Sequence, residues 1–130
     1  MSEPVKAPAV RLYGTVLDCL DAKSLARFYE RLLVWRLTMD ELDWCSLREP
    51  NGTGRISFQS EPDYVPPVWP PEAGKQQHSM HLDFEVDDLE AACAYALSCG
   101  ATLSPEQLLD DVRVFFDPSG HPFCFFVVTW

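Results

Sequence analysis

Several side chains able to do acid–base or metal chemistry alternate along one short segment of the chain. His81, Asp83 and Glu85 are separated by single apolar residues, so in a β-strand these three side chains point to one face. An imidazole among carboxylates can act as a general acid or base, or help to bind a cationic ligand. The segment therefore predicts a polar wall, with His81, Asp83 and Glu85 as candidate ligand-binding residues.

Asp18 lies in a similar alternating segment in the first half of the chain, and we expect it to face the same space. A structural role for these acids stays open, because unpaired buried carboxylates are costly. In that alternative Asp18 and Asp83 form ion pairs with arginines or accept hydrogen bonds from backbone amides. The arginines in question are Arg11, Arg36, Arg55 and Arg113.

Metal binding is a second chemistry that imidazole and thiolate groups allow. Cys124 stands among phenylalanines, which favours the alternative of a small apolar filler. His78 and His121 are weaker candidates, and a role in the adjacent turn is expected for His121.

The composition and the missing motifs exclude several classes of function. The chain has 20 acidic and 10 basic residues and a formal charge of −10, so nucleic acid and anionic membranes are poor partners. The sequence holds no GxSxG, GxGxxG or GxxxxGK motif, so none of these motifs supplies a nucleophile elbow or a phosphate-binding loop. The longest apolar run, residues 123–130, is far shorter than the roughly 20 residues that span a membrane.

The cysteines and the first residues indicate the compartment. Five cysteines, with no CxxC spacing, favour buried reduced thiols over a disulfide scaffold. Residues 1–10 carry charges and two prolines and no apolar stretch, so no secretory signal is visible. We therefore expect a cytoplasmic protein.

The alternation of apolar residues predicts one element order twice. In the first half we expect a strand over 11–20, a helix from an Asp21 cap to about Leu33, and strands over 34–39, 43–48 and 55–59. In the second half we expect a strand over 80–86, a helix from Asp88 to about Ser98 closed by Gly100, and strands over 101–104, 112–116 and 122–130. A shift of 67 residues pairs the two helices, whereas the turns at 49–52 and 117–120 pair at 68.

This repeat predicts an α+β fold of two βαβββ modules. The modules form a curled mixed sheet around a cavity, with the helices on the outer face. We expect a single domain over residues 1–130, with module one at about 9–60, a proline-rich connector at 61–77 and module two at about 78–130. An ordinary α+β sandwich with one coincident turn is the alternative.

The connector holds five prolines together with Tyr64 and Trp69. Such a stretch favours an extended, stiff segment. It is either a surface linker or a flap whose two aromatic side chains cover a pocket.

The sequence resembles the vicinal oxygen chelate superfamily, which includes glyoxalase I, bleomycin resistance proteins and extradiol dioxygenases. The resemblance extends over nearly the whole chain. It rests on the order of four segments, which are His81-Leu82-Asp83-Phe84-Glu85-Val86-Asp87-Asp88-Leu89, Cys99-Gly100-Ala101, Asp117-Pro118-Ser119-Gly120-His121-Pro122-Phe123, and Leu17-Asp18-Cys19-Leu20-Asp21 with Leu25-Ala26-Arg27-Phe28-Tyr29.

The resemblance implies specific positions for a divalent metal. Metal-using relatives hold Zn, Ni, Mn or Fe with a His or Gln early in the first strand of each module and a Glu late in the last strand. In this sequence His81 matches one position, Gly14 takes its counterpart, and Cys124 and either Ile56 or Ser57 take the other two. We therefore expect no cofactor, with a divalent metal as the alternative.

The function expected from the resemblance and these features is binding of a small organic molecule in the central cavity by a protein of the glyoxalase and bleomycin-resistance type. We expect a homodimer, as relatives often are. One alternative is a metal-dependent lyase or dioxygenase in which the candidate metal ligand His81 is joined by Gln59 and Cys124 in a rearranged ligand set, and another is a non-catalytic interaction module, so whether the protein is an enzyme stays open. The expected ligand-binding residues are Asp18, Trp44, Gln59, Tyr64, Trp69, His81, Asp83, Glu85 and Cys124.

Overall fold

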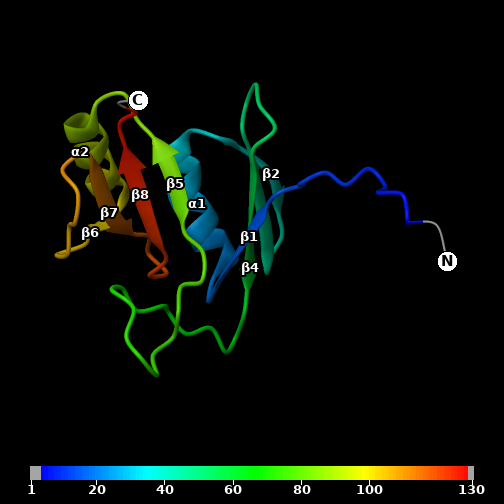
Figure 1. Ribbon diagram of the computed structural model, residues 1–130, viewed down its shortest axis with the longest axis horizontal. Coiled ribbons are helices and arrows are strands. Elements are labelled where there is room, and N and C mark those ends of the chain that lie inside the picture. The colour runs from blue at the N-terminus through cyan, green and yellow to red at the C-terminus, as the bar shows by residue number, and fades with distance from the viewer. Residues whose placement is uncertain (1–3, 129–130) are drawn as a thin grey trace.

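The computed structural model describes residues 4–128 and shows the same element order twice (Figure 1). Module one consists of β1 (Thr15–Cys19), α1 (Ala22–Leu33), β2 (Arg36–Asp40), β3 (Trp44–Arg48) and β4 (Arg55–Ser60). Module two consists of β5 (Leu82–Glu85), α2 (Leu89–Cys99), β6 (Thr102–Leu103), β7 (Val112–Phe116) and β8 (Pro122–Phe126). The two βαβββ modules and the α+β class are confirmed.

The strands of each module form their own four-stranded mixed sheet. The orders are β1-β4-β3-β2 and β5-β8-β7-β6, so the curl is built from two sheets rather than from one continuous ladder. β1 pairs in parallel with β4, Thr15 opposite Ile56, and β5 pairs in parallel with β8, Leu82 opposite Phe123. Both pairs have an offset of 41 residues, so the repeat continues through the last strand and Ser57, not Ile56, is the counterpart of Cys124.

Both helices begin and end where the local sequence predicts. The Asp21 carboxylate accepts a hydrogen bond from the Ser24 amide at 3.4 Å, and that of Asp88 accepts one from the Ala91 amide at 3.0 Å. Such bonds satisfy amides that the first helical turn leaves free. α2 ends at Gly100 with φ 108°, and α1 ends at Val34 with φ 56°.

The two modules share one apolar core beneath the helices. α1 contacts all four strands of its own sheet and also α2. Its Tyr29 ring stacks on Phe58 of β4 at a centroid distance of 5.6 Å and lies edge-on to Phe123 of β8 at 6.2 Å. Because Phe58 and Phe123 are both fully buried, Tyr29 joins the two sheets.

Several expected boundaries differ from the structure at strand ends. β1 begins at Thr15 instead of residue 11, and the N-terminal arm that precedes Tyr13 extends away from the sheets (Figure 1). β8 ends at Phe126, whereas the expected end at Trp130 lies outside the described residues. All five cysteines are free, and Cys93 alone among them is only half-buried. Within residues 4–128, neither helix has the length and apolar character needed to cross a membrane.

Candidate functional site

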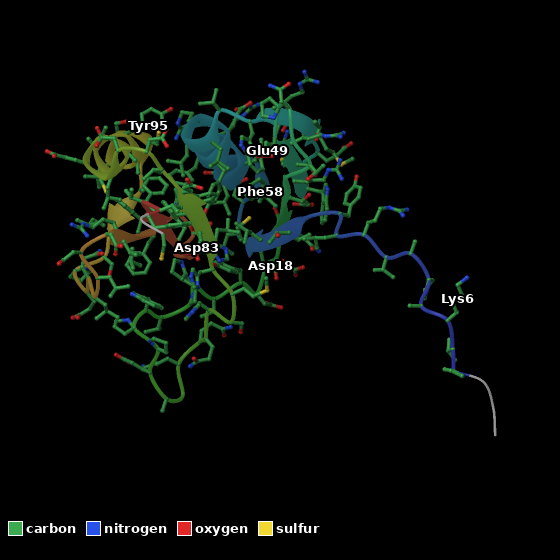
Figure 2. All side chains as sticks on the ribbon, turned by 45° about the horizontal axis from the view of Figure 1, so that its top comes forward. Lys6, Asp18, Glu49, Phe58, Asp83 and Tyr95 are labelled. Atoms are coloured by element: carbon green, nitrogen blue, oxygen red, sulfur yellow. The ribbon has the colours of Figure 1, made fainter. Side chains whose placement is uncertain are left out.

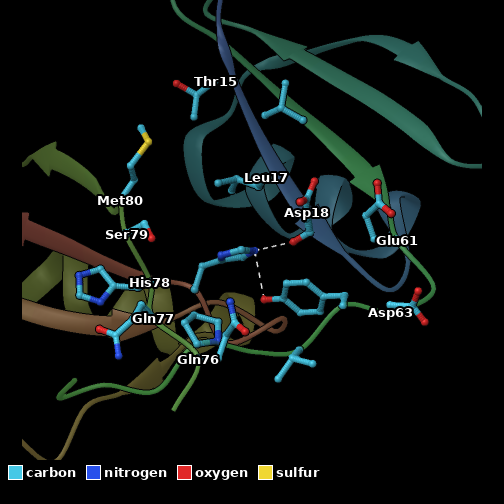
Figure 3. A pocket seen from close by; sticks show the side chains of 15 residues that line it. Thr15, Leu17, Asp18, Glu61, Asp63, Gln76, Gln77, His78, Ser79 and Met80 are labelled. Atoms are coloured by element: carbon cyan, nitrogen blue, oxygen red, sulfur yellow. Dashed lines mark hydrogen bonds between the residues drawn. The ribbon is translucent and has the colours of Figure 1, made fainter. Parts of the chain in front are cut away.

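A cavity of about 480 Å³ lies where β1, the connector and the residue after the last turn of module two meet (Figure 3). We call it the seam hollow, because it opens beside β1, at the border of the two sheets. Its walls are formed by residues from 61–67 and by residues 76–80, which are the two ends of the connector and the segment that leads into β5. The connector thus contributes more of the lining than either sheet does, and of the two aromatic residues expected to cover a pocket Tyr64 lines the hollow and Trp69 does not.

His121 joins the connector to β1 at the floor of the seam hollow. Its Nε2 lies 2.6 Å from the Asp18 carbonyl oxygen and 3.3 Å from the Tyr64 hydroxyl (Figure 3). The Tyr64 hydroxyl also donates to the Ser119 carbonyl at 2.7 Å. Since a carbonyl oxygen only accepts, Nε2 carries the hydrogen. The sequence predicted a turn role for His121, and its ring in addition lines the hollow.

Asp117 fixes the turn from which His121 projects. Its carboxylate is buried and accepts hydrogen bonds from the Tyr29 hydroxyl at 2.7 Å, the Ser119 amide at 2.9 Å and the His121 amide at 3.0 Å. Burial raises the pKa of Asp117, although His121 and these hydrogen bonds act in the opposite direction. Burial, with the nearby Asp117 charge, also raises the pKa of Tyr64, so the Tyr64 hydroxyl stays a neutral donor.

The lining of the seam hollow carries one sign of formal charge. Asp18, Glu61 and Asp63 contribute carboxylates, and His78 and His121 contribute imidazoles. Among the described residues, none that lines the hollow is Lys or Arg. Clefts lined by one sign of charge concentrate ligands of the opposite sign, so the hollow is suited to an organic cation or amine.

His81, Asp83 and Cys124 form a second cluster on module two. His81 Nε2 lies 3.1 Å from Asp83 Oδ1, and one ligand atom from each of the three residues lies within 4.8 Å of the others. Burial and the nearby Asp83 carboxylate raise the pKa of Cys124 to about 11, so the thiol is neutral at pH 7. The charged partner of Asp83 is His81. Among the described residues, neither Asp83 nor Asp18 forms an ion pair with an arginine, which was the structural alternative for these two acids.

The metal positions implied by the resemblance do not form a complete ligand set. Gly14 has no side chain to offer, and the Ser57 hydroxyl is hydrogen-bonded to Ser46 at 2.8 Å. His81 and Cys124 are thus the two positions that retain a ligand atom, with Asp83 as an additional neighbour. The family's ligand set, which takes ligands from both modules, is therefore incomplete at the module-one positions of this chain.

The remaining expected binding residues are spread over both sheets. Gln59 pairs with Asp18 on β1 and with Trp44 on β3, so it belongs to module one, apart from the His81 cluster. Glu85 is exposed on β5, and Figure 2 shows Asp83 and Asp18 on the two strands that border the seam. Trp69 packs edge-on against His78 at a centroid distance of 5.2 Å, so it contacts a lining residue without lining the seam hollow itself.

Of the expected residues, the seam hollow itself contains Asp18 and Tyr64, and His81 lines a separate, neighbouring pocket of about 30 Å³ between β1 and β5. Sequence reasoning missed Glu61, Asp63 and Met80 as lining residues. Their signal was position: each lies close to an end of the proline-dense segment. Because alternation patterns describe strands, residues in an irregular connector escape them.

The family described as Glyoxalase-like domain matches residues 14–126 of the chain. A search of curated proteins with this chain found no match.

Solved structures with the same fold include a glyoxalase-family enzyme, an antibiotic binding protein and a fosfomycin resistance protein. A glyoxalase/bleomycin resistance protein/dioxygenase family enzyme from Burkholderia phytofirmans PsJN has a TM-score of 0.68 at 16% identity, over 89% of this chain and 97% of its own. TnmS3, an antibiotic binding protein from Streptomyces sp. CB03234, has a TM-score of 0.64 at 15% identity, over 95% and 100%. The fosfomycin resistance protein FosX from Mesorhizobium loti has a TM-score of 0.66 at 13% identity, over 95% of each chain. At these identities the likeness establishes the fold.

Proposed function

This chain belongs to the glyoxalase-like domain family, and from that premise we propose that it binds a small organic molecule with an amine or another cationic group in the seam hollow. The observation that carries the proposal is the hollow of about 480 Å³, whose described lining has three carboxylates and neither Lys nor Arg. A pocket of this size accommodates a drug-sized ligand.

The walls offer both parts of such a recognition site. Asp18 and Glu61 supply charge for the cationic group, while Leu17, Met80 and the Tyr64 ring supply apolar surface. The neighbour TnmS3 is an antibiotic binding protein, which supports small-molecule binding as a use of this fold. The proposed binding mode does not use the family's metal site. In this chain Gly14 has no ligand atom, and the Ser57 hydroxyl is hydrogen-bonded to Ser46.

The test is a binding screen with two chemically matched sets of small aromatic molecules, one set bearing amines and one bearing carboxylates. Tryptophan fluorescence and thermal shift report binding. We expect saturable binding in the amine set and about tenfold weaker binding of the best amine by Asp18→Asn, because one charge-assisted contact is lost. Glu90→Gln, an exposed substitution on α2 that removes the same charge, serves as the matched control. A screen without hits, or with hits confined to carboxylates, contradicts the proposal.

A metal-dependent lyase or dioxygenase is the second candidate, and the observation that favours it is the His81–Asp83–Cys124 cluster. Imidazole, carboxylate and thiolate are the ligand types that Zn²⁺ takes in proteins. Elemental analysis of the purified protein used in the screen separates the candidates. Stoichiometric Zn, Ni, Mn or Fe that is lost in His81→Ala favours the enzyme, whereas metal-free protein that binds amines favours the binding protein. The expected homodimer and cytoplasmic location remain parts of the proposal.

A further inference from the structure

Three arginines form a single row across the sheet of module one. Arg36 on β2 is directly opposite Arg48 on β3, and Arg48 is directly opposite Arg55 on β4. Residues paired in this way lie on the same face of a sheet. On β3 the face toward the helix is occupied by the fully buried Cys45 and Leu47, so the arginine row lies on the opposite, open face.

This arrangement is electrostatically unfavourable without a counter-charge. Like charges directly opposite each other on neighbouring strands destabilise a sheet. The chain has twice as many acids as bases, yet no arginine of the row has a carboxylate within ion-pair distance among the described residues. Arg55 instead lies 3.7 Å from the centroid of the Tyr13 ring and donates to the Tyr13 carbonyl.

Arg36 and Arg48 border a groove rather than a flat surface. The groove has a volume of about 510 Å³, and its other wall is the turn that joins β3 to β4. From that turn Asn51 and Thr53 face the same space. Glu49 also lines the groove, but its carboxylate folds over Gly52, where it would collide with any added Cβ.

We propose that this groove, bounded by Arg36, Arg48 and the turn at residues 49–53, binds the phosphate group of a small molecule. Guanidinium groups bind phosphate through paired N–H donors. Donors here come from two strands and from a turn, which matches a tetrahedral anion better than a planar carboxylate. The net charge of −10 opposes a large polyanion such as nucleic acid, so the occupant is a small phosphate. The site lies on β2, β3 and the turn between β3 and β4, and it shares no residue with the lining of the seam hollow.

The test uses inorganic phosphate, with chloride adjusted to hold the ionic strength constant, and follows the arginine side-chain and backbone amide resonances by NMR. We expect saturable shifts confined to Arg36, Arg48 and the turn. Arg48→Gln should weaken binding at least about tenfold, because a charged hydrogen-bond donor is lost, while Glu49→Gln should strengthen it. Arg11→Gln in the exposed N-terminal arm removes the same charge as Arg48→Gln and should leave binding unchanged.

A comparison with succinate and a measurement of thermal stability test the phosphate assignment and the repulsion within the arginine row. Succinate at the same ionic strength should bind more weakly than phosphate, and tighter succinate binding overturns the phosphate assignment. Without phosphate, Arg48→Gln should unfold at the same or a higher temperature than the unsubstituted chain, since the row loses a repulsion; if it does not fold, Arg36→Gln replaces it. Shifts that do not saturate, or that change equally in Arg11→Gln and Arg48→Gln, overturn the proposal.

Discussion

Asp117 is the residue on which the geometry at the border of the modules most depends. Its carboxylate joins Tyr29 from α1 to the turn that carries His121, and His121 in turn contacts Asp18 and Tyr64. One buried side chain therefore positions groups from module one, the connector and module two. Removing all of its acceptor atoms leaves three donors without that partner, and each unsatisfied buried donor is costly.

The first prediction concerns the pH dependence that follows from the burial of Asp117. In the folded state, burial raises the pKa of this carboxyl above its ordinary value of 3.8. The folded protein therefore holds the proton more tightly than the unfolded chain does. The stabilising contribution is fully present below about pH 4 and is lost as the pH rises through the folded-state pKa. Asp117→Asn removes the titration, so the free energy of unfolding of the unsubstituted chain should fall relative to that of the variant between pH 4 and pH 7.

Urea denaturation at three pH values in this range measures the difference. Asp117→Ala, which also removes the acceptors, should cost about 1–3 kcal/mol throughout the range. If the unsubstituted chain instead gains stability relative to Asp117→Asn as the pH rises, its folded-state pKa is lowered and the physical account given for this residue is wrong.

At the scale of the elements, the two helices differ most in how they end. α2 ends at Gly100 in the left-handed conformation, and α1 ends at Val34 in the same region with φ 56°. A β-branched residue is strained there, because its Cβ crowds the following carbonyl. Val34 is 72% exposed, so little packing compensates for the strain.

Val34→Gly is therefore predicted to stabilise the protein by about 1 kcal/mol. The reverse change at the matching position, Gly100→Ala, should destabilise it by about 1 kcal/mol, and the added Cβ would meet nothing within 4 Å, so the effect is one of backbone conformation alone. Thermal and chemical unfolding of both variants provide the measurement. Destabilisation by Val34→Gly would indicate that the Val34 side chain contributes packing that outweighs the backbone strain.

The sequence predicted the elements well because their signals are local. The caps at Asp21, Asp88 and Gly100 and the strand alternation follow from short-range chemistry, and the structure has all of them. The site was predicted less completely, because the seam hollow depends on where the connector returns to the sheet. The sequence around the connector and the second turn does not indicate that Tyr64 would contact Ser119.

The register of the last strand in each module could not be predicted from the sequence either. The turns pair at a shift of 68 residues and the first strands at 67, so the sequence left Ile56 and Ser57 as equal candidates for the counterpart of Cys124. The pairing of Val16 with Ser57 and of Asp83 with Cys124 settles the choice. Hydrogen-bonded register is a property of two strands together, and a one-residue difference in a turn conceals it.

At the scale of the whole molecule, the question is whether two modules with separate sheets unfold as one domain. Phe123 of β8 contacts Phe28 and Tyr29 of α1 as well as Phe115 of its own sheet. Because this core is continuous across the modules, we expect one cooperative transition, with the whole chain as the folding unit.

Phe123→Ala tests this expectation. The substitution should reduce the free energy of unfolding by about 3–5 kcal/mol, because it removes a fully buried ring and leaves a cavity. Native-state amide hydrogen exchange should then show the same loss of protection in β3 and β4 of module one as in β7 and β8 of module two, since global opening exposes both. Leu103→Ala on the short β6, where the side chain is 42% exposed, serves as the control and should have a much smaller effect. A loss of protection confined to β5–β8 would show that module two unfolds while module one stays folded, and the chain would then consist of two domains that share a border.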